Sequence, residues 1–385
     1  MATVQVMRSL GVHIALENST WVVKGNKKFG LKEPSSVLDC KNSGTTIRLM
    51  AGMLSAMPFM SILDGTDQIK SRPMDRVVTP LCQMGAHIYG RSNNRLAPLV
   101  TLPAKIRGTS QTLAVKSAQV KSAIIMAALF ADGATEIFNT MATRDHTERM
   151  LGYMGAEIKT ESDCVMVQPL RGELKPLSFT VPGDISSAAF MLVAGALAAP
   201  GGITLKNVLV NQTRTGIIDA LITMGARISI HHERTVCNEA VADISVTQSA
   251  LKGATFSDGD HIVRMIDEIP ILALAATQSE GITEIRNASE LKVKETNRIA
   301  RTVESLRMLG ANIEATDDGM IIHGKTKLHG AEVSSFGDHR MALVLAIAGL
   351  ISKSPVTITN AEVTDDSFPG FLSTLITLGA NAIEI

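Results

Sequence analysis

Two kinds of apolar pattern alternate along the chain, and each predicts a different kind of helix. Segments of the first kind are apolar or small on nearly every side, which is typical of a helix that is buried all round. These segments are 43–57, 117–131, 186–199, 267–278 and 338–351. Segments of the second kind are amphipathic, as in 297–309, where Arg301, Glu304 and Arg307 interrupt the apolar positions. The pattern therefore predicts inner and outer helices in alternation, with short strand-like runs of Thr, Val and Ile between them.

A glycine in the motif Leu/Met-Gly-Ala/Val follows each predicted outer helix. These glycines are Gly11, Gly85, Gly155, Gly225, Gly310 and Gly379, at intervals of 69 to 85 residues. Glycine at this place is typical of the left-handed residue that ends a helix. Six copies at a near-constant interval indicate a repeat architecture. We expect each unit to have the order β-α-β-α-β-β.

The repeat predicts an α/β fold of two domains, each built from three βαβαββ units. The turn at Val181-Pro-Gly-Asp184 follows the third unit, so the expected domains are 1–180 and 181–385. The pattern holds six outer helices but five inner ones. We therefore expect the first unit to be incomplete, with an inner helix belonging before Thr3.

Composition excludes several functional classes. Lys and Arg together number 37, as do Asp and Glu, and aromatic residues make up 3%. A neutral chain with so few aromatics lacks the features of a nucleic-acid binder. Its longest apolar runs, such as 341–351, are shorter than the roughly 18–20 residues that span a bilayer. Without a signal-peptide pattern, paired cysteines or metal-ligand spacing of histidines, the sequence predicts a cytoplasmic protein that binds no membrane and holds no metal.

Polar residues collect where the predicted helices of the first half begin. Small residues in 38–48 open an inner helix, where backbone N–H groups favour an anion. Arg72 precedes Pro73 and is therefore expected in an extended turn. Further polar starts occur at 117–121 and 143–148. Each of these has a plainer interpretation, as an N-cap or a surface ion-pair partner.

The second half carries the corresponding charges at 265–270, 292–298 and 337–340. Lys294 and Arg298 are four residues apart, so we expect them on one face at the start of an outer helix. Two cations there oppose the helix dipole and repel each other unless an anion lies between them. A set of cations with two carboxylates suits anionic substrates and proton transfer.

These motifs, taken in order, resemble those of the enolpyruvyl transferase family, and within it the EPSP synthases. The matching strings are Asn42-Ser-Gly-Thr45 with Arg48, Arg72-Pro-Met with Arg76, Ser117-Ala-Gln119, Thr143-Arg-Asp-His-Thr147, Asp267-Glu-x-Pro270, Lys294-Glu-Thr-x-Arg298 and Asp338-His-Arg340. The resemblance runs from residue 3 to the C-terminus. It implies two inverse α/β domains, each of three βαβαββ units with the first unit incomplete, which agrees with the organisation that the repeats predict.

The resemblance implies a transferase of the shikimate pathway that uses no cofactor and acts as a monomer. It would move the carboxyvinyl group of phosphoenolpyruvate to the 5-hydroxyl of shikimate 3-phosphate and release phosphate. Asp267 and Glu295 would transfer protons. Phosphoenolpyruvate would be bound by Gly44, Arg72, Gln119, Arg298 and Arg340. Shikimate 3-phosphate would be bound by Ser117, Ala118, Gln119, Arg144, Asp267 and Lys294.

The sequence departs from the family pattern at three places. Lys41 stands where glycine is usual, and Asn297 replaces a frequent aspartate. The family's motif Gly-Asp-Lys-Ser-x-Ser-x-Arg is not present, so we expect about 50–60 N-terminal residues to be lacking. Two alternatives stay open: a UDP-N-acetylglucosamine enolpyruvyl transferase, whose usual loop cysteine is not found in 64–71, and an inactive, truncated remnant that only binds ligand.

Overall fold

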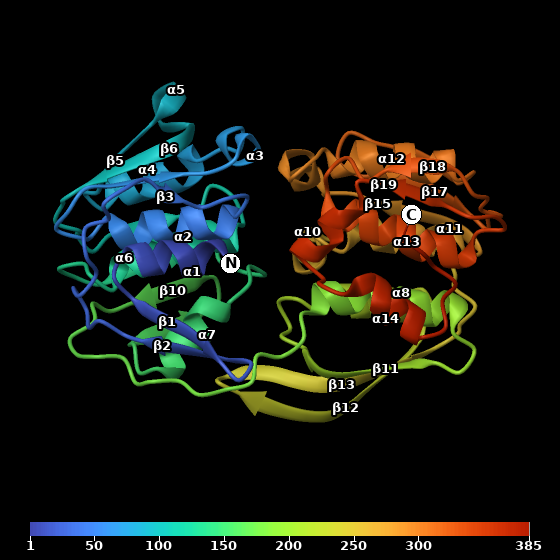
Figure 1. Ribbon diagram of the computed structural model, residues 1–385, viewed down its shortest axis with the longest axis horizontal. Helices are drawn as coiled ribbons and strands as arrows, with labels where there is room; N and C mark the ends of the chain where they lie inside the picture. Colours follow the sequence, from blue (N-terminus) through green and yellow to red (C-terminus); the bar gives the residue numbers. More distant parts are fainter. Residues whose placement is uncertain (385) are drawn as a thin grey trace. The chain divides into compact units, whose positions relative to one another are not determined.

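The computed structural model of the protein describes residues 1–384, which divide into two compact units, Met1–Ser178 and a second unit that begins at Phe179 (Figure 1). Each unit has its own hydrophobic core. None of the helices in the described residues combines the length and the apolar character that crossing a bilayer requires.

The first unit contains two buried inner helices, α2 (Gly44–Leu54) and α6 (Ala118–Ala128), which pack against each other. Its outer helices are α1 (Ala2–Ser9), α4 (Asp75–Gln83) and α7 (His146–Tyr153), and two short turns are α3 (Asp67–Lys70) and α5 (Arg91–Asn94). Its strands are β1 (His13–Glu17), β2 (Thr20–Lys24), β3 (Leu38–Asp39), β4 (Ser61–Asp64), β5 (His87–Gly90), β6 (Leu96–Leu102), β7 (Ser110–Thr112), β8 (Thr135–Phe138), β9 (Ile158–Glu161) and β10 (Cys164–Val167).

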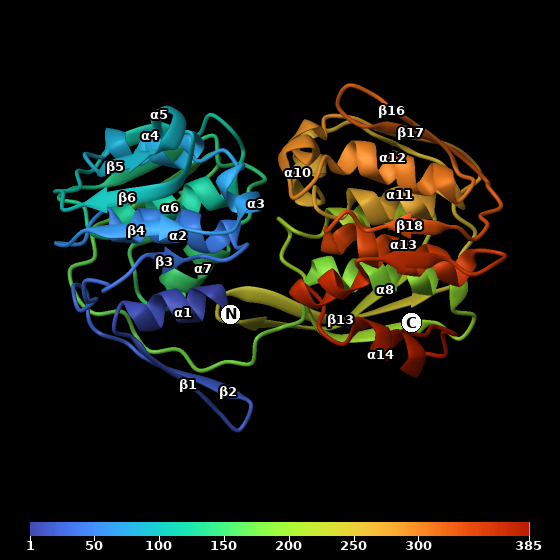
Figure 2. The ribbon, with the colours of Figure 1, turned by 45° about the horizontal axis from the view of Figure 1, so that its top comes forward.

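The second unit contains three inner helices, α8 (Ile185–Ala198), α11 (Ile269–Thr277) and α13 (His339–Ile351), each in contact with the other two (Figure 2). Its remaining helices are α9 (Gly216–Thr223), α10 (Gly259–Arg264), α12 (Arg298–Met308), α14 (Phe371–Thr377), η1 (Ser289–Val293) and η2 (Ala361–Asp366). Its strands are β11 (Ile203–Leu209), β12 (Arg227–Val236), β13 (Glu239–Thr247), β14 (Thr255–Phe256), β15 (Gly281–Ile285), β16 (Asn312–Ala315), β17 (Met320–Gly324), β18 (Glu332–Ser334) and β19 (Thr357–Thr359).

Three four-stranded sheets share one topology and confirm the predicted order of the repeat. Their strand orders are β3-β4-β6-β5, β7-β8-β10-β9 and β14-β15-β17-β16. In each sheet the first pair is parallel and the next two pairs are antiparallel. A parallel pair needs a crossover, and in these sheets an inner helix, α2, α6 or α11, supplies it.

The repeated glycines end the outer helices as predicted. All six have φ between 84° and 96°, a left-handed conformation that residues with a Cβ rarely adopt. In the second copy, the N–H of Ala86 donates to the carbonyl of Leu81, and the N–H of Gly85 donates to that of Cys82. These two bonds satisfy carbonyls that the end of α4 would otherwise leave unpaired.

Candidate active site

Asp267 lies just before α11, among side chains that come from α12, α13 and the loop before α12. The sequence predicts that Asp267 starts this helix, but the structure places the N-cap at Glu268 and the first helical residue at Ile269. Asp267 is therefore a loop residue, and its carboxylate is free to face neighbouring helices. The Asp267 side chain is 13% exposed.

Three cations surround the carboxylate of Asp267. Its Oδ1 lies 3.1 Å from Nζ of Lys294 and 3.3 Å from Nη1 of Arg298. Its Oδ2 lies 3.9 Å from Nη2 of Arg340. The structure therefore brings together three of the predicted anion-binding residues, and Asp267 is the anion that lies between Lys294 and Arg298.

The prediction that Lys294 and Arg298 share one face of a helix is wrong. Lys294 follows η1 in an extended conformation, and α12 begins only at Arg298, with Asn297 as its N-cap. The side chain of Asn297 accepts a hydrogen bond from the N–H of Ala300. Because the N-cap residue is not itself helical, Lys294 lies in the loop before α12. Lys294 and Arg298 are therefore brought together by this loop and not by the i,i+4 spacing of a helix.

Arg298 is the buried centre of this cluster, with a side chain that is 1% exposed. Its Nη2 donates to Glu295 at 2.6 Å, and its Nε donates to Asp338 at 2.9 Å. Burial by itself lowers the pKa of Arg298, but Asp338, Glu295 and Asp267 more than offset that effect and raise it. Arg298 is therefore held charged while it positions three carboxylates.

Asp338 and His339 begin α13 beside this cluster. Burial raises the pKa of Asp338, but the charge and hydrogen bonds of Arg298 outweigh it, so the net pKa is lowered. Burial lowers the pKa of His339, and the charges of Arg340 and Arg298 lower it further. A neutral imidazole next to an ionised carboxylate follows at neutral pH.

In the first unit, Arg72 lies against the beginning of α2. A Cβ built on Gly44 would come within 2.9 Å of Nη1 of Arg72, so glycine is needed for this close approach. Ser43 caps α2 by accepting the N–H of Thr46. A guanidinium beside the N–H groups of a helix start is a favourable arrangement for an anion.

Gln119 at the start of α6 is held beside α2 by two side chains. Arg48 donates a hydrogen bond from Nη1 to Oε1 of Gln119, and Nε2 of Gln119 donates to Oγ1 of Thr45 at 2.9 Å. Nη2 of Arg48 also donates to the carbonyl of Pro73 at 3.2 Å, next to Arg72. Arg48 thus joins Gly44, Arg72 and Gln119 into one group.

The other residues predicted in the first unit lie at two helix starts. Ser117 is the N-cap of α6, and Ala118 is its first residue. Arg144 precedes α7, which begins at His146, and is partly exposed. The hydroxyls of Ser122 and Thr147, 2.6 Å apart, connect these two helices.

Sequence reasoning assigned no role to three residues that the structure places in these groups. Arg48, Asp338 and Glu268 all belong to the matched motifs, and this was the signal that the sequence offered. Their burial, at 4%, 0% and 0% exposed, is seen only in the structure.

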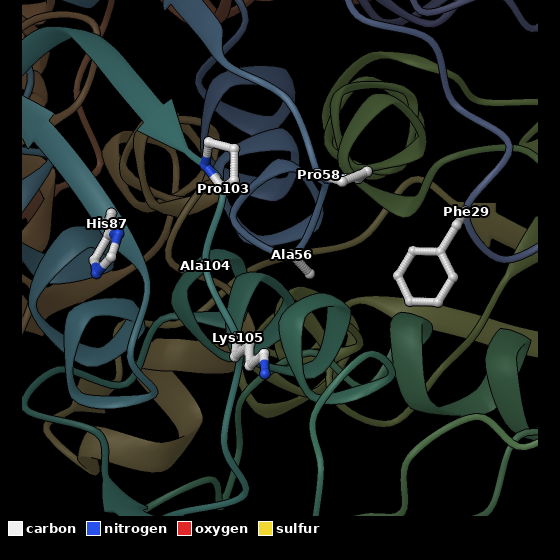
Figure 3. A pocket seen from close by; sticks show the side chains of 7 residues that line it. All are labelled: Phe29, Ala56, Pro58, His87, Pro103, Ala104 and Lys105. Carbon is white, nitrogen blue, oxygen red and sulfur yellow. The ribbon is translucent and has the colours of Figure 1, made fainter.

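An open hollow of about 540 Å³ lies elsewhere in the first unit (Figure 3). Phe29, Pro103 and Lys105 are among the residues that line it, and none of the predicted site residues does. Within residues 1–384, no group of three His, Cys, Asp or Glu side chains is arranged to hold a metal ion. The cluster around Arg72 in the first unit and the cluster around Arg298 in the second are therefore the candidate sites.

Comparison with known proteins tests which family this chain belongs to. The family model described as EPSP synthase (3-phosphoshikimate 1-carboxyvinyltransferase) matches residues 1–375. The chain belongs to the EPSP synthase family. A relative named 3-phosphoshikimate 1-carboxyvinyltransferase, from Geobacillus kaustophilus (strain HTA426), is 50% identical over 383 residues, which cover 98% of this chain and 88% of the relative. The resemblance drawn from the motifs is thereby confirmed.

Solved structures of EPSP synthases and of a more distant enolpyruvyl transferase have the same fold. An EPSP synthase from Acinetobacter baumannii has a TM-score of 0.86 and 39% identity, and the match covers 98% of this chain and 87% of that one. The enolpyruvyl transferase NikO from Streptomyces tendae has a TM-score of 0.77, over 99% of this chain and 86% of its own, but only 16% identity, so it supports the fold alone. The predicted fold class is confirmed, and these EPSP synthase matches do not favour the UDP-N-acetylglucosamine alternative.

Proposed function

We propose that this EPSP synthase family member transfers the carboxyvinyl group of phosphoenolpyruvate to the 5-hydroxyl of shikimate 3-phosphate. The observation that carries the proposal is the cluster in which Arg298 contacts both Asp267 and Glu295. Two carboxylates on one buried guanidinium provide a base and an acid at a short separation, which the addition of an alcohol to an enol phosphate requires.

The reaction would proceed by addition followed by elimination. Asp267 takes the proton of the 5-hydroxyl while that oxygen bonds to C2 of phosphoenolpyruvate, and Glu295 delivers a proton to C3. In the second step Glu295 takes a proton back from C3, the double bond forms again, and the C2–O bond to phosphate breaks as Asp267 gives its proton to the departing phosphate. The proton taken from the hydroxyl balances the one left on the released phosphate, so the residues regain their starting states.

Binding of the two anionic substrates would use the cations of both clusters. For phosphoenolpyruvate we assign Gly44, Arg72, Gln119, Arg298 and Arg340. For shikimate 3-phosphate we assign Ser117, Ala118, Gln119, Arg144, Asp267 and Lys294. Arginine suits the planar carboxylate and the phosphate because its N–H groups bond in a bidentate manner.

The ion pair between Lys294 and Asp267 has a direct consequence for this mechanism. Nζ of Lys294 lies 3.1 Å from Oδ1 of Asp267. A substrate phosphate that binds Lys294 would draw the ammonium away from Oδ1, which keeps Nη1 of Arg298 as a donor and can then also accept from the 5-hydroxyl. Substrate binding and base activation are then one event.

The test is phosphate release by the purified chain, measured with both substrates present. We expect Glu295→Gln and Asp267→Asn each to lower kcat by about 10²–10⁴-fold, the usual range for a general acid or base, with little change in KM. Glu304→Gln is the matched control, because Glu304 is an exposed carboxylate of α12 that pairs with Arg301. The control should keep kcat within about twofold.

Two outcomes would remove the assignment. If UDP-N-acetylglucosamine supports phosphate release where shikimate 3-phosphate does not, the acceptor is wrong. If either carboxamide variant keeps a kcat near that of the parent, that residue has no part in proton transfer. A chain that binds shikimate 3-phosphate in calorimetry without turnover would favour the ligand-binding remnant.

We further propose that the two compact units are the two three-repeat domains, divided near residue 180, and that the protein works as a monomer in the cytoplasm. The four cysteines support a reducing compartment, since each is a free thiol. Sedimentation with and without substrates tests the monomeric state.

A further inference from the structure

Glu268 is a second carboxylate next to Asp267, and it lies in a different environment. Its side chain is 0% exposed, whereas that of Asp267 is 13% exposed. Among the described residues, Oε2 of Glu268 has no hydrogen-bond partner. Burying a carboxylate costs folding free energy unless neighbouring groups compensate for its lost hydration. The groups that contact Glu268 therefore determine whether its burial is tolerated.

The contacts of Glu268 join the beginnings of three inner helices. Ser186, in the first turn of α8, donates its hydroxyl to Oε1 of Glu268, which is the N-cap of α11. The same Oε1 lies 3.6 Å from Nη1 of Arg340, in the first turn of α13. One oxygen atom therefore faces both α8 and α13.

Arg214 extends this network behind Ser186. Its Nη2 donates to Oγ of Ser186 at 2.6 Å and to Oδ1 of Asp184 at 2.9 Å. Because Arg214 already donates to the Ser186 oxygen, the hydroxyl hydrogen of Ser186 is directed to Glu268. Arg214, which precedes α9, thereby supports the Ser186 hydroxyl from behind.

The close protein contacts of the Arg340 guanidinium are made by Nη1. Its Nη1 faces Oε1 of Glu268 and donates to the main-chain carbonyl of Asp267 at 3.1 Å. Its Nη2 lies farther from protein oxygens, 3.9 Å from Oδ2 of Asp267, and the side chain is 13% exposed. Arginine carries five N–H donors in a planar fork, so fixing Nη1 orients the remaining donors.

We propose that Glu268 is a positioning residue for Arg340. With Ser186 and Arg214 behind it, Glu268 holds the Arg340 guanidinium so that its Nη2 edge meets the anionic group of phosphoenolpyruvate. Glu268 does not touch substrate and moves no proton. The inference rests on the proposed function, since it explains how one of the assigned phosphoenolpyruvate residues is oriented.

The first test is a double-mutant cycle in urea unfolding, which needs no activity. Glu268→Gln keeps the size of the side chain but removes its charge, and Arg340→Met removes the guanidinium. We expect the unfolding equilibrium constants to depart from additivity by about tenfold, within the range for residues in direct contact. The exposed pair Arg301 and Glu304, 2.6 Å apart, is the matched control, and its Arg301→Met and Glu304→Gln cycle should depart by about twofold.

The second test is steady-state kinetics of the whole chain. Glu268→Gln should raise KM for phosphoenolpyruvate by about tenfold and change KM for shikimate 3-phosphate by less than about threefold. Ser186→Ala, which keeps the carboxylate but removes its hydroxyl donor, should raise the phosphoenolpyruvate KM by a smaller factor. This variant replaces Glu268→Gln in both tests if the latter does not fold.

The proposal is overturned if the effects of Glu268→Gln and Arg340→Met on the unfolding equilibrium are additive. It is also overturned if KM rises equally for phosphoenolpyruvate and for shikimate 3-phosphate, because a general structural defect would produce that result. If the parent chain does not turn over, the proposed function fails, and the unfolding cycle still decides whether Glu268 and Arg340 are coupled. Coupling together with a selective change for phosphoenolpyruvate supports the positioning role.

Discussion

Lys121 and Glu148 form a buried ion pair between α6 and α7, and replacing one partner should strongly destabilise the first unit. Nζ of Lys121 lies 2.5 Å from Oε1 of Glu148, and the two side chains are 2% and 5% exposed. Burial raises the pKa of Glu148, and Lys121 offsets only part of that rise. The pair is therefore poorly hydrated and depends on its mutual attraction.

Lys121→Met leaves the Glu148 carboxylate buried without its cation. Breaking a buried pair in this way costs about 3–5 kcal/mol, whereas replacing both partners with apolar residues of similar volume is about neutral or stabilising. Since a domain is stable by only about 5–15 kcal/mol, the single variant should lose a large part of its stability. Lys121→Met with Glu148→Leu should recover most of it.

The assay is urea unfolding of the parent, both single variants and the double variant, at several pH values. A carboxyl with a raised pKa contributes stability that is complete below its ordinary value of 4.5 and is lost as the pH rises through the raised pKa. The deficit of Lys121→Met should therefore shrink as the pH falls and Glu148 becomes protonated. Lys159→Met, which removes an exposed lysine of β9, should change the unfolding free energy by less than about 0.5 kcal/mol.

Additive costs in the double variant would refute this reasoning, because they would mean that the two charges do not compensate each other. A deficit of Lys121→Met that is the same at pH 5 and pH 8 would also refute it.

Four further variants test local features. Gly52→Ala should cost about 1–3 kcal/mol of unfolding free energy, because its Cβ would lie 2.1 Å from a main-chain oxygen of α6; Gly152→Ala, where a Cβ meets nothing within 4 Å, should instead stabilise by about 0.5–1 kcal/mol in the same assay. His339→Gln should flatten the pH dependence of thermal unfolding below pH 6.5. A histidine with a lowered pKa contributes stability that is complete above the ordinary pKa of 6.5 and is lost as the pH falls through the lowered pKa. An unchanged pH profile would contradict this expectation. Asn297→Ala removes the N-cap of α12 and should lower Tm, at a cost of about 0.5–2 kcal/mol in unfolding free energy; an unchanged Tm would show that the cap adds nothing.

The positions of helices and turns in this protein follow from local patterns. The six glycines are needed because each outer helix ends in a left-handed residue, and that requirement belongs to one residue and its own backbone. The inner helices are recognisable because their apolar residues leave no polar face. Their ends are less local: 117–131 was predicted, but α6 covers Ala118–Ala128, because the final turns depend on what packs against them.

The sequence by itself marked Asp267, Lys294 and Arg298 as a charged group at helix starts, but it misjudged their geometry. An i,i+4 face was expected, and a capped loop before α12 was found, because the Asn297 side chain satisfies the helix start. Only the tertiary structure placed Asp338, forty residues beyond Arg298, on the same guanidinium. No local rule joins positions so far apart, since their contact depends on how α12 packs against α13.

The same distinction holds for the buried charges. Lys121 occurs in an apolar helix, and the sequence alone does not tell whether its ammonium reaches solvent or a partner. The packing of α6 against its neighbours encloses Lys121, and Glu148 from α7 then becomes its counterion. Composition and periodicity thus determined the repeat, the helices and the residue types available for chemistry. The choice of partner for each charge was decided by tertiary packing, because burial makes an unpaired charge too costly to keep.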